Sequence, residues 1–495
     1  MAATSCEGAR CARLVRFANG TAMTLSRRAF TAGIIAAPAI LKAARAAPPP
    51  LPNIAAEDAI FAVPGSALYD DTLPAYNLRT ELRPAVRVLA KTARGMAQAI
   101  DWVRARSLPF ALRSGGHCFE GFSQSASIAI DTRLMKTISI DETTKLLSVG
   151  AGATLGDIYR FVGPRGYGFP GGSCPTVGIS GHTMGGGFGL IARDRGLACD
   201  SLAGIELIDA DARPLRASAA ENADLFWACR GGGGGTFGAA TQLDFAIEKI
   251  GPVAVYAATW TLPMAQAVSL FKSWQDWAPR APDAITGIFK LSRRRDGRLT
   301  LHAAGQSTGS IAELKRELRA LSDAAEPSTG PTLSTMSFLG AIDHFSGGWG
   351  YESKYSKGKS DYITAPLDDA GIEALLGGIA ALPAGEVIAI CDAYGGSVGR
   401  TGNDATAFAY RAGTQFCIQY YTSWQGAGTG PRRLADLRRL YAAMRPWSGG
   451  AYVNYCDLDL DNWQQAYWRQ NLPRLKAIKA KFDPANVFRH AQSVI

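Results

Sequence analysis

Short apolar stretches separated by polar and glycine-rich turns make up the first half of the chain. Strand-like stretches occupy residues 110–112, 128–131, 146–149 and 241–247. Thr154 can cap a helix whose apolar side chains share one face, at Leu155, Ile158, Phe161 and Val162. Because strands and helices alternate at this short spacing, we predict mixed α and β structure from residue 55 to about 250.

Residues 252–450 have longer elements and fewer glycine clusters. Amphipathic helices and strands are predicted in alternation, at 312–321, 387–393, 415–421 and 432–444. This change of pattern predicts a second domain. The tail from Trp463 to Lys481 is predicted to be helical on either side of Pro473.

Charge is unevenly distributed over the 495 residues. The chain has 52 Lys and Arg against 42 Asp and Glu, and its formal charge of +10 could suggest a nucleic-acid partner. However, seven basic residues and one acidic residue lie in the first 46 positions, so the remainder has 45 basic and 41 acidic residues and a charge of +4. We therefore expect no nucleic-acid partner for the mature chain.

The amino-terminal segment has the features of an export signal. Ser26-Arg27-Arg28-Ala29-Phe30-Thr31 precedes the uncharged run 32–41 and the cleavage pattern Ala44-Arg45-Ala46. It resembles a twin-arginine signal, which implies recognition by the twin-arginine export machinery and a periplasmic or secreted protein. The run is shorter than the about 20 residues of a membrane span, so we expect no stable membrane anchor.

Two further points about the leader stay open. A disordered basic tail with a chance Arg-Arg pair is the alternative to a signal. Residues 1–22 form an unusually long lead-in, so we hypothesise that translation begins at Met23.

The spacing of the cysteines predicts neither a disulfide framework nor a metal site. Removal of residues 1–46 reduces nine cysteines to seven, at positions 118, 174, 199, 229, 391, 417 and 456. Their spacing is irregular and lacks C-x-x-C pairs. Export permits disulfides, but the odd number leaves at least one cysteine for another role.

Two glycine-rich segments predict backbone that closely approaches a ligand. Arg113-Ser114-Gly115-Gly116-His117-Cys118 follows the strand at 110–112, and its N–H groups can form an anion nest, although an ordinary turn would use the same residues. Residues 171–189 contain eight glycines. A large flat or phosphorylated ligand would explain their entropic cost.

A third segment, 231–238, contains the spacing G-x-G-x-x-G at 233, 235 and 238. A Rossmann site requires a helix directly afterwards. Residues 241–247 instead alternate like a strand, and the similar stretch 187–192 leads into a polar turn. We therefore reject a Rossmann nicotinamide site, and the sequence has no Walker A motif.

Five motifs in a fixed order resemble the berberine-bridge-enzyme-like flavoproteins over residues 55–495. They are residues 113–117, 174–178, the glycine run through Gly189, Asp224-Leu225-Phe226-Trp227-Ala228 with the glycine tract after it, and Tyr452-Val453-Asn454-Tyr455. The resemblance implies an α+β, two-domain vanillyl-alcohol-oxidase-type FAD fold. It divides the chain into a signal peptide at 1–46, an FAD-binding domain at 47–250, an α/β substrate-binding domain at 251–450 and a return to the FAD-binding domain at 451–495.

The resemblance also implies that FAD is attached twice, through His117 to the 8α carbon and through Cys174 to C6. Imidazole and thiolate are reasonable nucleophiles for these bonds. A buried thiol and a turn histidine without flavin bonds are the alternative. The other cofactor-binding positions are Arg113, Ser114, Gly115, Gly116, Val177, Gly178, Gly181, His182, Gly187, Gly189, Gly238 and Asn454.

For catalysis, Tyr455 matches the family's proton acceptor and Tyr452 its neighbour, although core packing would also explain both tyrosines. A phenol needs nearby positive charge or hydrogen bonds to act as a base at neutral pH. Histidines are poor candidates for the base: His302 and His490 are isolated, His344 lies in an unmatched loop, and His182 lies within the glycine run. The glutamate of the alkaloid-cyclising members is replaced in the strand by Cys417, which leaves Gln419 as a substrate contact.

The resulting hypothesis is an exported FAD oxidase that removes a hydride from an alcohol, sugar or oligosaccharide and reduces O2 to hydrogen peroxide. Val177 matches a position that the resemblance associates with access of O2. The alternatives are an oxidative tailoring enzyme acting at a C–H or amine centre, a flavin dehydrogenase with poor O2 reactivity, and a non-catalytic flavin-binding protein. The sequence leaves the oligomeric state open.

Overall fold

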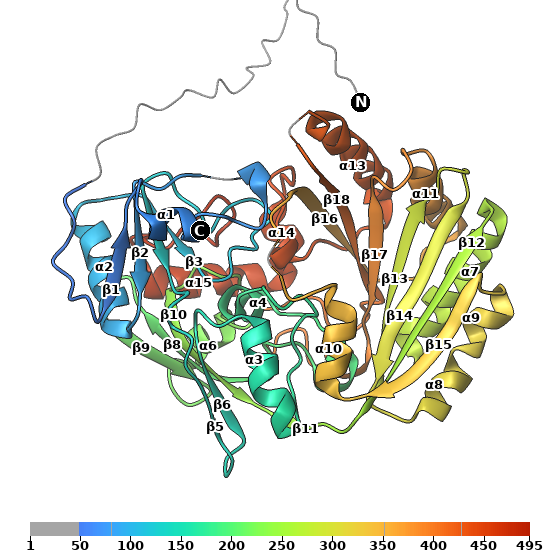
Figure 1. Ribbon diagram of the computed structural model, residues 1–495, viewed down its shortest axis with the longest axis horizontal. Helices are drawn as coiled ribbons and strands as arrows, with labels where there is room; N and C mark the ends of the chain where they lie inside the picture. The colour runs from blue at the N-terminus through green and yellow to red at the C-terminus, as the bar shows by residue number, and fades with distance from the viewer. Residues whose placement is uncertain (1–48, 81, 351, 427) are drawn as a thin grey trace, which may run out of the picture. The chain divides into compact units, whose positions relative to one another are not determined.

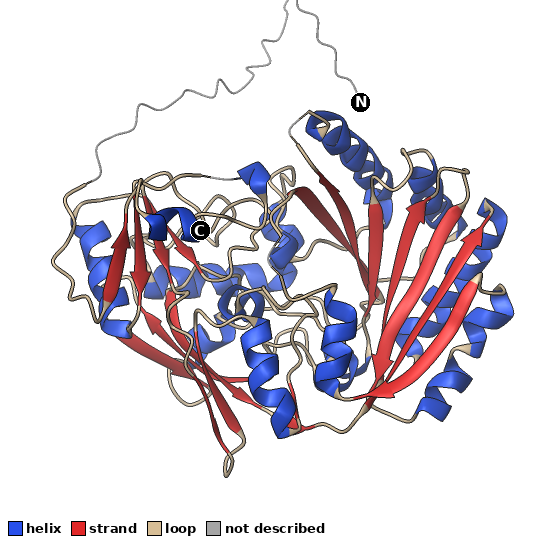
Figure 2. Ribbon diagram, viewed as in Figure 1, coloured by secondary structure: helices blue, strands red, loops and turns tan. Residues whose placement is uncertain are grey.

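The computed structural model describes residues 49–80, 82–350, 352–426 and 428–495. These residues belong to one compact unit, 47–495. The predicted signal at 1–46, with its Arg27-Arg28 pair, its cleavage site and the start at Met23, lies outside the described residues. Helices and strands are both abundant, which confirms the α+β class (Figure 2).

A four-stranded sheet opens the fold, in the order β1-β2-β4-β3. Its strands are Ala59–Ala62, Val86–Ala90, Ile128–Asp131 and Phe110–Arg113. Strands β2 and β3 run parallel to β4, and β1 runs antiparallel to β2. Helix α2 (Ala93–Ala105), capped by Thr92, packs its apolar side chains against this sheet (Figure 1). The predicted strands at 110–112 and 128–131 are confirmed.

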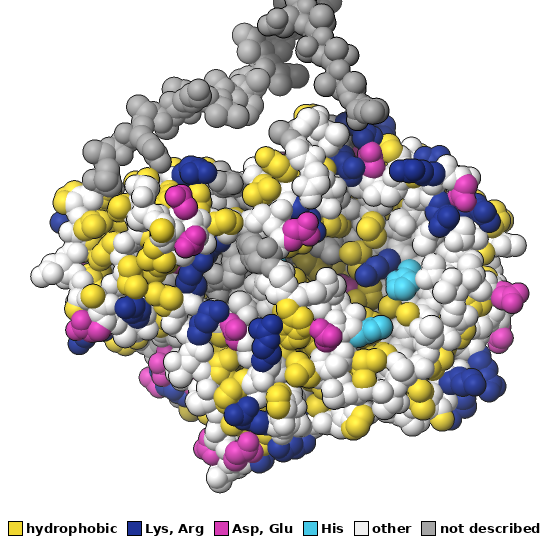
Figure 3. Space-filling model, viewed as in Figure 1, with side chains coloured by type: hydrophobic (Ala, Val, Ile, Leu, Met, Phe, Trp, Pro, Cys, Tyr) yellow, Lys and Arg dark blue, Asp and Glu magenta, His cyan; other side chains and the backbone are white. Residues whose placement is uncertain are grey.

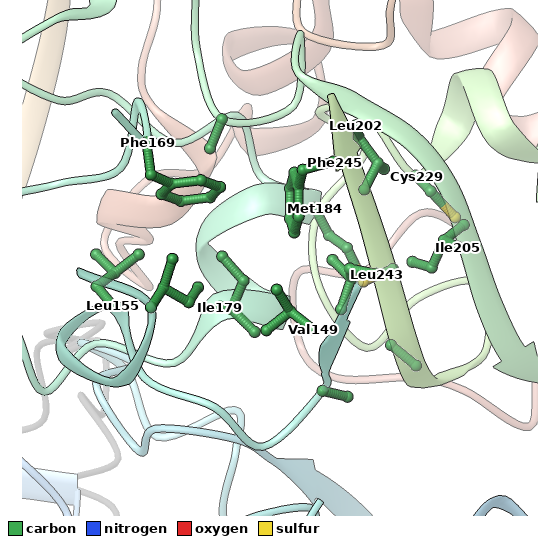
Figure 4. Packing of buried hydrophobic residues seen from close by; sticks show 14 of the residues in the cluster. Val149, Leu155, Phe169, Ile179, Met184, Leu202, Ile205, Cys229, Leu243 and Phe245 are labelled. Carbon is green, nitrogen blue, oxygen red and sulfur yellow. The ribbon is translucent and has the colours of Figure 1, made fainter. Parts of the chain in front are cut away.

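A five-stranded antiparallel sheet follows, in the order β5-β6-β10-β8-β9. Its strands are Ile138–Asp141, Leu146–Gly150, Ala239–Ala246, Leu202–Ile208 and Pro214–Ser218. Figure 4 shows Ile179 and Met184 of α4 (Ile179–Met184) packed with Val149 and Leu243 of this sheet. Because β10 directly follows the third glycine segment, the rejection of a Rossmann site is confirmed.

The remaining elements of the first half are short. They are α1 (Ala67–Thr72), η1 (Leu78–Thr80), α3 (Leu155–Val162), η2 (Gly163–Arg165), α5 (Ala192–Arg195), α6 (Ala223–Ala228) and the paired strands β7 (Tyr167–Gly168) and β11 (Glu248–Lys249). The helix predicted after Thr154 is confirmed: Thr154 and Asp157 form a reciprocal capping box at its start.

A seven-stranded antiparallel sheet forms the second half, in the order β15-β12-β14-β13-β17-β18-β16. Its strands are Thr329–Met336, Val253–Leu262, Leu299–Ser307, Ile285–Arg293, Ile388–Ala393, Phe416–Trp424 and Tyr355–Ile363. The strands predicted at 387–393 and 415–421 are confirmed as β17 and β18. All seven strands lie within the predicted 251–450 segment.

Helices cover one face of this sheet (Figure 1). They are α7 (Met264–Trp277), η3 (Ala278–Arg280), α8 (Ile311–Glu317), α9 (Arg319–Ala324), α11 (Asp369–Ala380), α13 (Gly430–Met444) and η4 (Arg445–Trp447). The helix predicted at 432–444 is confirmed. The single helix predicted at 312–321 is wrong, because the chain forms two short helices that meet at Leu318. Helices α10 (Phe338–Ser346) and α12 (Gly396–Arg400) complete this half.

The tail returns to the first half of the molecule. After η5 (Val453–Tyr455) come α14 (Trp463–Trp468), η6 (Arg469–Asn471) and α15 (Leu472–Phe482). Its helices pack into the core of the five-stranded sheet. The tail is helical on both sides as predicted, but the break lies at η6, and Pro473 is within the first turn of α15, where its missing N–H has no cost.

Two surface properties complete the description. On the face in Figure 3, basic and acidic side chains are interspersed. Among the helices of the described ranges, none is both long and apolar enough to cross a membrane.

Candidate active site

A cavity of about 570 Å³ lies where the glycine-rich loops, the tail and the uncovered face of the seven-stranded sheet meet. This volume is in the range of small-molecule and cofactor sites. Every predicted site residue except Gly187 lines it. Gly187 has φ +88°, and a Cβ built there would lie 2.7 Å from Ala198 Cβ and 2.8 Å from the ring of His182.

The second and third glycine segments present bare backbone to the cavity. A Cβ built at Gly181 or Gly235 would have no atom within 4 Å beyond its own local backbone, and one at Gly234 would meet only the Cα of Gly181, at 3.2 Å. Gly235 also has φ +72°, which favours glycine. These positions therefore leave room for a flat or phosphorylated ligand to contact the backbone.

The first glycine segment packs directly on the second. A Cβ at Gly115 would lie 2.2 Å from the backbone nitrogen of Gly178, so both positions require glycine. Arg113 fixes the preceding strand end because its guanidinium donates to the carbonyl oxygens of Leu73, at 3.1 Å, and Pro74. The predicted turn is thus a rigid wall of the cavity.

His117 projects from this wall. Its ring stacks on Tyr76 with a centroid distance of 4.4 Å, and its Nε2 lies 2.9 Å from the hydroxyl of Thr176. Burial, and secondarily the charge of Arg113, lower the pKa of His117 to about 4. The imidazole is therefore neutral at pH 7 and keeps a nitrogen lone pair.

Cys174 also contacts this hydroxyl. Its Sγ is 3.6 Å from Thr176 Oγ1, and both residues come from the loop before α4. Val177 lines the cavity next to them. One threonine thus contacts both predicted attachment residues.

Two further histidines line the cavity. His182 accepts a hydrogen bond at Nε2 from the N–H of Gly172 at 3.2 Å, and burial lowers its pKa to about 4. His490 stacks on Phe122 with a centroid distance of 4.5 Å, and burial likewise lowers its pKa to about 4. The interpretation of His490 as isolated is wrong, because the returning tail brings it to the cavity.

Tyr452 and Asn454 form a structural link between tail and glycine loop. The Tyr452 hydroxyl accepts the N–H of Gly187 at 2.8 Å and the side-chain amide of Asn454 at 3.0 Å. Asn454 also donates to the carbonyl of His182 at 3.0 Å. Burial raises the pKa of Tyr452, so its phenol stays protonated at neutral pH.

Tyr455 faces the cavity without such bonds. Its ring packs edge-on against Tyr452 and Phe119, with centroid distances of 4.9 and 5.8 Å. Burial raises its pKa well above the ordinary value, and the negative charge of Asp392 acts in the same direction. Its role as proton acceptor stays a prediction, and this environment opposes a free phenolate.

The seven-stranded sheet supplies the opposite wall through rows of paired residues. Lys290 on β13 pairs with Ile390 on β17, which pairs with Gln419 on β18. Paired residues point to the same face. Ile288, Asp392 and Cys417 form the next row in the same manner. Both rows reach the cavity except at Cys417.

Asp392 and Lys290 are the polar residues of this wall that sequence reasoning missed. Asp392 is 6% exposed, and burial raises its pKa to about 7 against the opposing effect of Lys290. A carboxylate with that pKa can exchange a proton near neutral pH. The available signal was a charged residue inside the otherwise apolar strand at 387–393.

Cys417 is buried in a cluster with Tyr362 and Tyr394 at the end of its row. Burial raises its pKa well above the ordinary value, so the thiol is neutral. Gln419, two residues on, is buried and lines the cavity. Among the described residues, no group of three or more metal-ligating side chains could hold a metal ion.

Two family models match segments of the chain that line this cavity. The family model described as FAD binding domain matches residues 84–218, and the model described as berberine and berberine-like matches residues 451–495. The first range contains the His117 and Cys174 loops, and the second contains Tyr452, Asn454 and Tyr455.

Relatives of similar length extend this match over most of the chain. The FAD-linked oxidoreductase YgaK of Bacillus subtilis is 33% identical over 431 residues, covering 86% of this chain and 94% of the relative. The monolignol oxidoreductase AtBBE-like 13 of Arabidopsis thaliana is 32% identical, covering 78% of this chain and 79% of the relative.

Solved structures agree. BBE-like 1 of Physcomitrella patens superposes with a TM-score of 0.83 at 28% identity, covering 89% of this chain and 97% of that protein. A berberine bridge enzyme variant described as a reticuline dehydrogenase gives a TM-score of 0.81 at 26% identity, covering 88% of this chain and 96% of that protein.

The glycine backbone left open at Gly181, Gly234 and Gly235 fits the FAD that the matched domain binds. The α+β architecture is the vanillyl-alcohol-oxidase-type fold of these neighbours. With relatives above 30% identity over most of its length, the chain belongs to the berberine-bridge-enzyme-like family of FAD-linked oxidoreductases.

Proposed function

We propose that this oxidoreductase oxidises a hydroxyl-bearing substrate (an alcohol, sugar or oligosaccharide) and passes the electrons to O2, giving hydrogen peroxide. The observation that carries the proposal is a polar row on the substrate side of the seven-stranded sheet. Lys290 and Gln419 lie in this row on either side of Ile390.

The row continues beyond the cavity. His302 on β14 pairs with Lys290, and Thr259 on β12 pairs with His302, whose Nδ1 lies 2.8 Å from the Thr259 hydroxyl. Burial and the charge of Lys290 lower the pKa of His302, so this imidazole is neutral at pH 7. Neutral and cationic donors spaced along one face suit a ligand with several hydroxyl groups, and Lys290 is exposed to receive it.

A base for the substrate hydroxyl is available in the pair Tyr455 and Asp392. Tyr455 accepts the substrate proton at its phenol oxygen while Asp392 takes up the phenol's own proton, directly or through one water. Both residues line the cavity, and the negative charge of Asp392 raises the pKa of Tyr455. Ionised Asp392 supplies what a lone buried phenol lacks, a proton acceptor effective near pH 7.

His117 and Cys174 are proposed to hold the cofactor covalently. FAD, when bound, supplies the chemistry of accepting a hydride and returning the electrons to O2. The neutral imidazole of His117 and the Cys174 sulfur, both beside Thr176, provide the nucleophiles for two bonds. Val177 lies next to them in the cavity wall and is the proposed site of O2 access.

The proposal also includes export. The Arg27-Arg28 segment directs the chain to the twin-arginine machinery, and the mature protein is periplasmic or secreted. Replacement of both arginines by lysine should retain the flavoprotein inside the producing cell. Unchanged export of the Lys-Lys variant would contradict this part of the proposal.

The activity is tested by a substrate panel. Purified holoenzyme is given alcohols, mono- and oligosaccharides, phenolics and benzylic amines. Peroxide release is measured in air, and bleaching of the flavin absorbance is measured separately under nitrogen. Bleaching and peroxide with the hydroxylated compounds support the proposal. Bleaching without peroxide would instead identify a dehydrogenase.

A second candidate, oxidative tailoring at a C–H or amine centre, is favoured by the aromatic side of the cavity. Phe119 packs edge-on against Tyr421 with a centroid distance of 6.3 Å, and both line the cavity beside Phe122. Aromatic surfaces of this kind can stack on a flat substrate. Bleaching by the amines alone would favour this candidate over the first.

A further inference from the structure

Two cysteines that are far apart in the sequence lie in contact beside the cavity. Cys118 directly follows His117, and Cys456 directly follows Tyr455. Their Sγ atoms are 3.6 Å apart across 338 residues of sequence, and both residues line the cavity. Both are free thiols.

A buried lysine holds the two cysteine loops together. Lys357 on β16 donates to Glu120, two residues after Cys118, and at 2.5 Å to Asp457, which directly follows Cys456. All three charged residues are buried. Because one ammonium group contacts both loops, the thiols are brought together before any bond joins them.

The tail side of this arrangement has further fixed points. The backbone N–H of Asp457 donates to the Tyr467 hydroxyl at 3.0 Å, and its carbonyl accepts from the Gln492 amide at 2.8 Å. Cys456 is therefore held by its neighbours. A disulfide has an S–S distance of about 2.0 Å, so closure from 3.6 Å requires the two sulfurs to move closer together by less than 2 Å.

The two sulfurs are chemically unequal. The N–H of Phe122 donates to Cys118 Sγ at 3.2 Å. The hydrogen bond between the two sulfurs lowers the pKa of Cys118 and raises that of Cys456. Since the thiolate is the nucleophile in disulfide exchange, Cys118 is the attacking sulfur.

We infer that Cys118 and Cys456 form a reversible disulfide that fastens the loop of His117 to the loop of Tyr455. The oxidant is a disulfide compound, either glutathione disulfide or a thiol-oxidising protein. Cys118 thiolate attacks one sulfur of the oxidant, breaks its S–S bond and releases one thiol. Cys456, after losing its proton to solvent, attacks the mixed disulfide and releases the second thiol, so two cysteines are oxidised and one disulfide is reduced.

The bond would join the cofactor side of the cavity to its catalytic side. It would also attach the 451–495 tail covalently to the loop of His117. The described cysteines form no other disulfide that does so. This inference goes beyond the proposed function and holds whichever substrate the enzyme takes.

Peptide mapping of the holoenzyme tests the inference. The protein is incubated with glutathione disulfide, alkylated without reductant and digested with trypsin. Peptides 114–133 and 440–469, which contain Cys118 and Cys456, should be found in one disulfide-linked species, two hydrogen atoms lighter than the sum of its reduced parts, and reduction should release peptide 440–469. Alkylated thiols at both positions after this oxidation would overturn the inference.

The same map keeps the disulfide distinct from the flavin. Peptide 114–133 also contains His117, but a flavin–histidine bond survives the reductant that separates a disulfide. A disulfide-linked pair without flavin mass would refute the proposed covalent attachment and leave the inference standing. Flavin mass on separate, alkylated peptides would do the reverse.

Thermal unfolding gives an independent measurement. The oxidised holoenzyme should unfold about 5 °C above the reduced one, since the bond closes a long loop. Cys118→Ser and Cys456→Ser should each abolish this redox-dependent shift, whereas Cys229→Ala, a change at a buried cysteine away from the cavity, should keep it. A shift that persists in either serine variant would contradict the assignment.

Discussion

The Nε2 atom of His117 lies 2.9 Å from the hydroxyl of Thr176. The same hydroxyl lies 3.6 Å from Cys174 Sγ, so one short side chain contacts both proposed attachment sites. A hydroxyl can both donate and accept, and it can therefore orient a neutral imidazole and a thiol at once. This arrangement makes the covalent proposal open to a direct chemical test.

Acid denaturation of the wild-type protein should leave the flavin on the polypeptide. His117→Ala and Cys174→Ala should each retain flavin through the remaining bond, and the double variant should release all of it. The measurement is visible absorbance of the acid precipitate, with peptide masses to locate each bond.

Cys229→Ala serves as the control for loss of a thiol, because Cys229 is buried away from the cavity. It should behave as the wild type. Complete release of yellow colour from the wild-type precipitate would refute covalent attachment.

Replacement of Asp392 by Asn should lower kcat/KM by a factor of about 10² to 10⁴, the usual contribution of a general base. With a pKa of about 7, the wild-type carboxylate is ionised above that pH, so kcat/KM should rise as the pH increases through 7 and then level off. The Asn variant should lose this rise. The check is a pH profile of kcat/KM between pH 5 and 9.

Asp361 provides a matched control. Burial raises its pKa to about 7 as well, but it is paired with Arg445 at 2.9 Å and lies outside the cavity lining. Asp361→Asn should therefore keep the pH-dependent rise of kcat/KM. An unchanged profile in the Asp392 variant would remove this residue from the mechanism.

Local pattern was sufficient for much of the fold. The strand at 128–131 has the predicted bounds and the helix capped by Thr154 begins where it was predicted, because alternation and capping are properties of neighbouring residues. The break at Leu318 was missed because the amphipathic pattern continues through it. Short-range patterns thus predicted where elements lie better than where they are interrupted.

The residues of the cavity wall opposite the glycine loops could not be predicted from such local patterns. Lys290, Asp392 and Gln419 become neighbours only through the register of β13, β17 and β18, which the sequence does not contain in any one stretch. Of the three, Gln419 alone was found, from the family resemblance. His490 was missed for the same reason, since only the return of the tail brings it to Phe122.

Replacement of Tyr452 should mainly reduce stability, whereas replacement of Tyr455 should mainly reduce activity. Tyr452→Phe leaves the buried N–H of Gly187 without its acceptor, so the free energy of unfolding should fall by about 1–3 kcal/mol. Tyr455→Phe removes a hydroxyl that faces the cavity, so unfolding should change little while kcat/KM falls about 10²-fold or more. Chemical denaturation and initial rates on both variants test this difference, and equal stability losses would contradict it.

The buried ion pairs of Lys357 with Glu120 and Asp457 should contribute strongly to stability. Lys357→Met leaves Glu120 and Asp457 buried with fewer cations, and truncation of one partner in such a cluster costs about 3–5 kcal/mol. Arg79 at 2.6 Å from Glu120 and Lys359 at 2.6 Å from Asp457 remain, which favours the lower end of that range.

Lys272→Met is the comparison for this variant. Lys272 pairs with Asp369 at 2.6 Å, but both side chains are exposed, so their ion pair should contribute less than about 1 kcal/mol. Denaturant unfolding of reduced protein measures both changes without the Cys118–Cys456 bond. Equal losses of stability in the two variants would mean that the buried Lys357 cluster contributes no more than an exposed ion pair. The cluster would then not hold the cysteine loops together.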